Sequence, residues 1–89
     1  IKKEMTRLSI QDQMEEFMFL GLRKTEGVSA STFERLYGKP LEAVYEEPAR
    51  RLIREGLLLR YQKEDGSVFF RLSDKGIDVS NYALAMFLF

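Results

Sequence analysis

The sequence has 89 residues, of which 45% are hydrophobic and 31% charged, and its 14 basic residues balance its 14 acidic ones. It contains no cysteine and no histidine, which excludes disulfides, thiolate nucleophiles, imidazole metal ligands and Ser-His or Cys-His catalysis. A chain of this length forms one small domain, and no apolar run reaches the roughly 18 residues that span a bilayer. We therefore expect a cytoplasmic protein, and we interpret the chain, which opens at Ile1 rather than Met, as a fragment of a longer one.

The first predicted helix opens at Ser9. The Ser9 hydroxyl can accept a hydrogen bond from a free amide one turn into the helix, and the carboxylate of Asp12 suits the positive helix start. Gly27 is the predicted stop. With 100° between successive residues, one stripe of the helix should face the core. The stripe consists of Ile10, Met14, Phe17, Met18, Gly21 and Leu22.

A shorter second helix is predicted from Ala30 to Tyr37. Ser29 supplies its N-cap, and Gly38 is the residue just past its end. Its buried side should carry Phe33, Leu36 and Tyr37.

The third predicted helix starts at Pro40, because a proline in the first turn loses no hydrogen bond, and it ends at Gly56. Pro48 lies inside this helix and should bend or break it, since the proline ring displaces a backbone hydrogen bond. The predicted core face consists of Leu41, Val44, Tyr45, Pro48, Ala49 and Leu52.

Two strands are predicted next, at 57–63 and 67–72, joined by Glu64-Asp65-Gly66. An Asp-Gly pair between β-forming runs favours a hairpin. A final helix follows from Ser73 or Asp74. The expected fold is α+β and mainly helical: a winged-helix-like domain with three helices, a two-stranded hairpin as the wing, and a C-terminal helix.

Residues 1–8 are interpreted as a tail or the end of an interdomain linker, and residues 9–89 as the domain itself. Nucleic-acid binding is the first function to weigh for a winged helix, because its third helix can enter the major groove. Here the N-terminal half of that helix is acidic, and two of its three arginines have acidic partners four residues earlier. The predicted pairs are Glu46–Arg50 and Glu47–Arg51. We therefore expect no nucleic-acid partner.

The first helix carries an aromatic residue, Phe19, on its polar face, flanked by Asp12, Glu16 and Arg23. Two interpretations remain open. Phe19 packs under the final helix or the wing, or it forms a docking surface with Glu16 and Arg23 for something absent from this chain.

The last helix is apolar nearly all round. Ile77, Leu84 and Leu88 form one stripe, whereas Met86 and Phe87 point elsewhere. One interpretation is a partly exposed tail; the favoured one is burial against a neighbouring domain. Met86 and Phe87 therefore join Glu16, Phe19 and Arg23 as the candidate interdomain or substrate-facing residues. No group of residues looks catalytic, so this segment alone is expected not to be an enzyme.

The segment Glu15-Glu16-Phe17-Met18-Phe19-Leu20-Gly21-Leu22-Arg23-Lys24-Thr25-Glu26-Gly27-Val28 closely resembles the E-E-x-[ML]-F-L-G-L-R-x-x-x-G-[LV] pattern that opens the C-terminal domain of oxygen-independent coproporphyrinogen-III oxidase-like proteins. The resemblance continues through Leu52 to Leu58 and through Leu72 to Asn81, which looks like an L-T-x-K-G-x-x-x-S-N stretch. It is closer to the haem-chaperone-like branch than to the true oxidases.

This resemblance implies a parent protein, enzyme or enzyme-like, with an N-terminal radical-SAM barrel that holds a [4Fe–4S] cluster and S-adenosylmethionine. The oxidases decarboxylate coproporphyrinogen III, and the chaperone-like branch binds haem and passes it on. None of the cofactor residues maps onto this segment, which is expected to pack on the barrel and help cover a tetrapyrrole. Arg23 could pair with a propionate or make a structural ion pair. The alternative is a free-standing winged-helix module that binds nucleic acid or protein.

Overall fold

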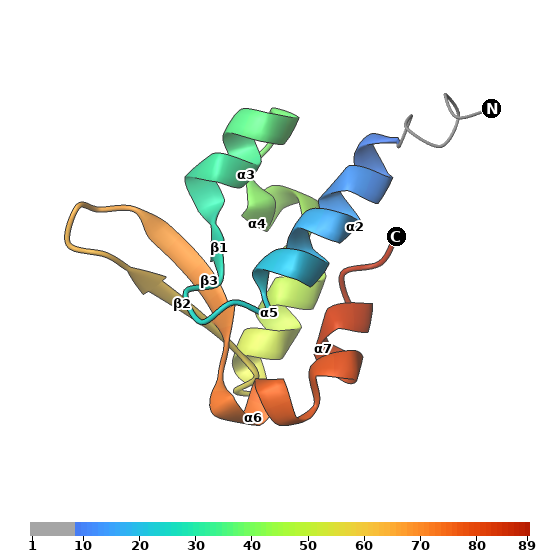
Figure 1. Ribbon diagram of the computed structural model, residues 1–89, viewed down its shortest axis with the longest axis vertical. Helices are drawn as coiled ribbons and strands as arrows, with labels where there is room; N and C mark the ends of the chain where they lie inside the picture. Colours follow the sequence, from blue (N-terminus) through green and yellow to red (C-terminus); the bar gives the residue numbers. More distant parts are fainter. Residues whose placement is uncertain (1–8) are drawn as a thin grey trace.

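The computed structural model describes residues 9–89, so the predicted tail or linker at 1–8 lies outside the described residues. Helices and short strands follow one another along the chain, and the strands form one small sheet that lies on one side of the helices (Figure 1). In chain order the elements are α2 (Ile10–Gly21), β1 (Val28–Ser29), α3 (Ala30–Tyr37), α4 (Leu41–Val44), α5 (Glu46–Arg54), β2 (Leu58–Gln62), β3 (Val68–Leu72), α6 (Asp74–Asp78) and α7 (Ser80–Ala85).

The sheet confirms the predicted hairpin and adds a strand to it. β2 and β3 pair antiparallel, with Leu58 opposite Leu72 and Gln62 opposite Val68. β1 pairs antiparallel with the other edge of β3, so the strand order is β1-β3-β2. Sequence reasoning missed β1 because a strand of two residues is too short to show alternation. The order of helices and strands is that of a winged helix, as predicted.

The predicted helix caps are confirmed where a serine or glycine stands at the boundary. The Ser9 hydroxyl accepts from the amide of Asp12 at 3.0 Å, and the Ser29 hydroxyl accepts from the amide of Thr32 at 3.2 Å. Gly38 ends α3 in the left-handed conformation, with φ of 78°. The predicted stop at Gly27 is wrong, because α2 already ends at Gly21.

Two predicted helices are each broken in two. The third predicted helix breaks at Tyr45, so that Pro48 becomes the third residue of α5, where a missing N–H leaves no intrahelical hydrogen bond unmade. The final predicted helix breaks at Val79, and neither proline nor glycine marks that position. The two break residues share nearly the same backbone conformation, φ −114° and ψ 38° at Tyr45 and φ −116° and ψ 38° at Val79.

The core is formed by side chains from the helices, from the sheet and from the segment after α7. Its largest fully buried residues are Phe33, Phe70 and Phe87. Two positions predicted to face the core, Ile10 and Leu36, are exposed instead. Ile10 is the first residue of α2, beyond the reach of the packed face. The predicted stripe of the last helix is divided, because Leu84 is buried whereas Ile77 and Leu88, on either side of it, are exposed.

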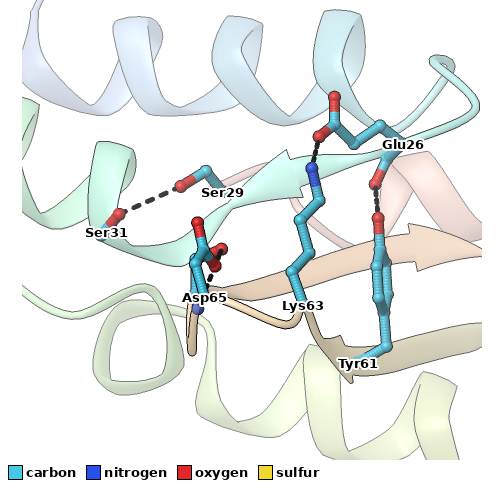
Figure 2. Close-up of polar contacts among 7 residues, drawn as sticks. Glu26, Ser29, Ser31, Tyr61, Lys63 and Asp65 are labelled. Carbon is cyan, nitrogen blue, oxygen red and sulfur yellow. Dashed lines mark hydrogen bonds and ion pairs between the residues drawn. The ribbon is translucent and has the colours of Figure 1, made fainter.

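The wing is attached to the loop that follows α2 (Figure 2). The Tyr61 hydroxyl donates to the backbone carbonyl of Glu26 at 2.7 Å, and Lys63 forms an ion pair with the Glu26 carboxylate. In the hairpin turn, the Asp65 carboxylate accepts from the amide of Ser67 at 2.9 Å and from its hydroxyl. These hydrogen bonds from Ser67 lower the pKa of Asp65.

Gly27 and Gly38 provide a matched test of how closely the loop after α2 approaches the sheet. Both have positive φ, of 86° and 78°, so alanine at either position incurs a conformational cost of about 1 kcal/mol. A Cβ at Gly38 would meet nothing, whereas at Gly27 it would collide with the carbonyl oxygen of Phe70. We expect Gly27→Ala to destabilise the protein by about 1–3 kcal/mol more than Gly38→Ala, measured by urea denaturation. Equal losses would contradict the close approach.

Candidate functional site

The outer face of α2 carries the polar residues that the sequence placed opposite the core. Asp12, Glu16 and Phe19 follow one another along α2 at intervals of one turn, and Arg23 lies just past the end of that helix. All of them but Phe19 are exposed. Phe19 is half-buried and packs against the core cluster, although its ring also borders the surface. Phe19 therefore contributes to the core and also lines an exposed groove, and its role as a docking residue stays a prediction.

This groove has a volume of about 440 Å³ and runs between α2 and the C-terminal segment. We call it the α2 groove, and define it by the residues that line it. They are Asp12, Glu15, Glu16, Phe19, Leu20 and Leu88. Three carboxylates and three apolar side chains thus meet at one surface. Such a groove can hold an apolar side chain that has a positive charge beside it.

The segment after α7 forms one wall of the α2 groove, and Figure 1 shows the chain ending beside α2. The backbone amide of Phe89 donates to the Glu15 carboxylate at 2.8 Å. The Phe89 ring lies against the Tyr45 ring, with centroids 5.4 Å apart and planes tilted by 34°. One charged residue of α2 and one aromatic residue at the break between α4 and α5 therefore hold this segment in place.

Below that segment, Tyr45 is buried without a hydrogen-bond partner for its hydroxyl among the described residues. Burial raises the pKa of Tyr45 far above its ordinary value, and the negative charge of Glu15 raises it further. The phenol therefore stays neutral at physiological pH. A buried hydroxyl without a partner costs free energy, so its ring packing has to outweigh that cost.

The five candidate residues from the sequence are not all brought together. Glu16 and Phe19 line the α2 groove, and Arg23 places its guanidinium over the Phe19 ring at 6.0 Å from the centroid. No structural ion pair of Arg23 is present among residues 9–89. Met86 is half-buried against the core and Phe87 is fully buried within it, so the Phe87 side chain already has all its contacts inside the domain.

Sequence reasoning missed three groove residues, namely Glu15, Leu20 and Leu88. Leu20 could have been found, because an apolar residue two positions after a core residue of α2 falls on the far side of the helical projection. The place of Leu88 depends on the break at Val79, for which the sequence carries no signal.

The charged face of α5 carries several ion pairs. Arg50 contacts Glu46 at 2.8 Å, as predicted, and Glu47 at 3.7 Å. Arg51 pairs with Glu55 at 3.4 Å, so the predicted Glu47–Arg51 pair is wrong. Arg50 and Arg51 of α5 are therefore each paired with a glutamate, whereas Arg54 has no ion pair among the described residues.

Residues 9–89 contain neither a candidate metal site nor a helix that could cross a membrane. No group of three or more acidic side chains there is arranged to hold a metal ion. No helix in the same range combines the length and the apolar character that crossing a membrane requires.

Fold and surface together define a small winged-helix domain whose core is closed by a C-terminal segment and whose α2 groove is left uncovered. The chain belongs to the HemN C-terminal domain family, which it matches over residues 8–79. It is 36% identical to the heme chaperone HemW of Lactococcus lactis subsp. lactis (strain IL1403) over 81 residues, which are 91% of this chain and 20% of that protein.

A second relative is the heme chaperone HemW of Bacillus subtilis (strain 168), with 41% identity over 51 residues, or 57% of this chain and 14% of that protein. The chain therefore spans a fifth or less of the length of these two relatives. No solved structure matched the chain. The family assignment confirms the resemblance seen in the sequence, including its haem-chaperone branch.

The unpaired hydroxyl of Tyr45 can be tested by removing it. Tyr45→Phe keeps the ring contacts and removes a buried polar group, so we expect the free energy of unfolding to rise by about 1 kcal/mol. Tyr37→Phe is the matched control, because the Tyr37 hydroxyl donates to the carbonyl of Gln13 at 3.3 Å. That variant should lose about 0.5–1 kcal/mol in the same urea titration. If the Tyr45→Phe protein is less stable than the unsubstituted protein, the Tyr45 hydroxyl has a hydrogen-bond partner.

Proposed function

We propose that this chain is a non-catalytic C-terminal domain of a cytoplasmic radical-SAM protein, that it packs on the barrel of that protein, and that it helps to cover the tetrapyrrole site. The observation that carries the proposal is the uncovered α2 groove in a domain whose own core is complete. The relatives support it, because their matched regions are 20% and 14% of longer proteins. A surface left open in the domain alone can be covered by the remainder of such a protein.

A haem-handling parent is the better-supported branch of the proposal. Both curated relatives reported above carry the name heme chaperone, and neither is named as an oxidase. We therefore favour haem binding and transfer over decarboxylation of coproporphyrinogen III for the intact protein.

The radical-SAM cofactors do not fit the residues of this chain. A [4Fe–4S] cluster is held by cysteine thiolates, and the sequence contains no cysteine. The described residues also offer no alternative cluster of metal ligands. The cluster and S-adenosylmethionine would belong to the preceding barrel. The part left to this domain is to exclude water from a bound tetrapyrrole and to close over its flat surface.

Nucleic-acid binding by a free-standing module is less well supported. Residues at the start of α5 that would approach phosphates are Glu46 and Glu47, and Arg50 contacts both of them. A free-standing module that binds protein would use the same α2 groove. The sequence of the full-length polypeptide therefore distinguishes such a module from a domain of a radical-SAM protein.

The polypeptide that precedes Ile1 provides the first test. We expect it to contain a C-x-x-x-C-x-x-C motif at the end of the first barrel strand, and we expect the purified intact protein to carry iron and sulfide at about four atoms each per chain. The measurements are the upstream sequence and an iron and sulfide analysis. A parent without that motif would contradict the radical-SAM proposal and favour a free-standing binding module.

Arg23 provides a test of contact with the tetrapyrrole itself. A guanidinium matches the geometry of a propionate carboxylate, and Arg23, which is exposed just past the end of α2, lies over the Phe19 ring. Arg23→Ala in the intact protein should weaken haem binding about ten-fold, measured by titration of the Soret absorbance, without lowering the urea midpoint.

Arg54→Ala is the control for Arg23→Ala, since Arg54 is an exposed arginine at the end of α5. The haem affinity of the intact Arg54→Ala protein should equal that of the unsubstituted protein. An Arg23→Ala protein with unchanged haem affinity would remove Arg23 from the substrate site and leave it as a surface residue that stacks on Phe19.

A further inference from the structure

The α2 groove has an acidic rim that forms no ion pair with any of the described residues. Asp12 and Glu16 form no ion pair within residues 9–89, and they are spaced i,i+4, at which like charges repel. Glu15 accepts one hydrogen bond, from the amide of Phe89. A positive charge placed over this rim would therefore relieve the repulsion and gain three acceptors.

The floor of the same groove is apolar and open. Leu20 is 58% exposed and Leu88 is 51% exposed, although both are large aliphatic residues. They lie beside Phe19, which is half-buried. Contiguous exposed apolar side chains with a polar rim are typical of surfaces that contact another protein.

We infer that the α2 groove is the face that meets the preceding domain of the same polypeptide, and that this domain inserts an aliphatic side chain flanked by a lysine or arginine. The inference rests on the proposed function, because it takes the preceding domain as the partner. Leu20 and Leu88 bury the aliphatic group, while Asp12 and Glu16 accept the cation. The apolar contact supplies affinity, and the charges orient the two surfaces.

The position of the groove favours this occupant. The described chain begins at Ser9, and Asp12 lies within the first turn of α2, so a preceding domain would be joined to the same helix that carries the acidic rim. Tethering converts docking into an intramolecular step with a high effective concentration, and a modest contact then suffices.

Two other occupants fit the charges less well. A second copy related by a two-fold axis would place the same acidic rim on both sides of the contact, which repels. A tetrapyrrole would direct its propionates at three carboxylates. Neither difficulty applies to a basic and aliphatic ridge.

The residues of the segment 15–28, which carries the resemblance described above, fall into a buried group and an exposed group. Met18 and Leu22 are fully buried, and a Cβ at Gly21 would collide with Val28, so these three serve the core of the domain. The core does not account for Glu16 and Leu20, which are exposed and line the groove. A contact outside the domain gives them a role.

Hydroxyl-radical footprinting of the intact protein tests the inference with internal controls. Leu20 and Leu88 are 58% and 51% exposed in the domain, and Leu36 and Ile77, which lie elsewhere, are 55% and 57% exposed. Without a covering partner the four aliphatic residues should be oxidised at similar rates. We expect Leu20 and Leu88 to be oxidised several-fold more slowly than Leu36 and Ile77.

Glu16→Lys in the intact protein then tests the charge. This variant should weaken docking about five-fold and restore oxidation of Leu20 and Leu88. It should not unfold the domain, because a lysine four residues after Asp12 forms a favourable helical pair. Glu34→Lys, at an exposed glutamate of α3, is the control and should leave all four rates unchanged.

Protection of Leu20 and Leu88 that Glu16→Lys abolishes would support the inference. If Leu36 or Ile77 is protected while Leu20 and Leu88 are oxidised rapidly, the inference is overturned. The proposal that the domain packs on the barrel would then stand, with another face of the domain in contact. Similar oxidation of all four residues would overturn the inference, and it would overturn the proposed packing as well if no other exposed side chain of the domain were protected.

Discussion

The packing of Tyr45 is the contact on which most of this domain depends. Its ring lies 6.2 Å from that of Phe33, 5.1 Å from that of Phe87 and 5.4 Å from that of Phe89, so it joins α3, the α4–α5 junction and the C-terminal segment. Edge-on and tilted aromatic contacts of this kind add to the free energy of simple burial. They compensate for a hydroxyl that is buried without a partner.

The backbone break at Tyr45 makes this packing possible. A helix continuous from residue 41 to residue 54 would need an amide at Pro48 to bond the carbonyl of Val44, and proline has none. With the break in place, Tyr45 leaves the helical spiral and Ala49 and Leu52 of α5 still face the core. The C-terminal segment then closes over Tyr45, and the acidic side of α2 is left next to its last residues.

The sequence predicted the parts of this structure that local physics determines. Ser9 and Ser29 cap helices because their hydroxyls reach backbone amides nearby, Gly38 adopts positive φ, and an Asp-Gly pair turns the hairpin. What it missed depends on tertiary contacts. β1 exists because β3 has an edge to pair with, and the exposed position of Leu88 follows from a break at Val79 that no residue type marks. Five of the six residues that line the α2 groove lie on α2, where a helical projection of the sequence can place them, whereas Leu88 could not be placed in that way.

The burial of Phe87 also bears on the order in which the polypeptide acquires its structure. Phe87 is fully buried and follows every helix and strand described here, so the core lacks one of its three largest fully buried side chains until synthesis has passed that residue. Domains generally fold as units from the N-terminal end while the ribosome is still translating. A domain that precedes this one would consequently acquire its own fold first, and would offer a finished surface when Phe87 leaves the ribosome.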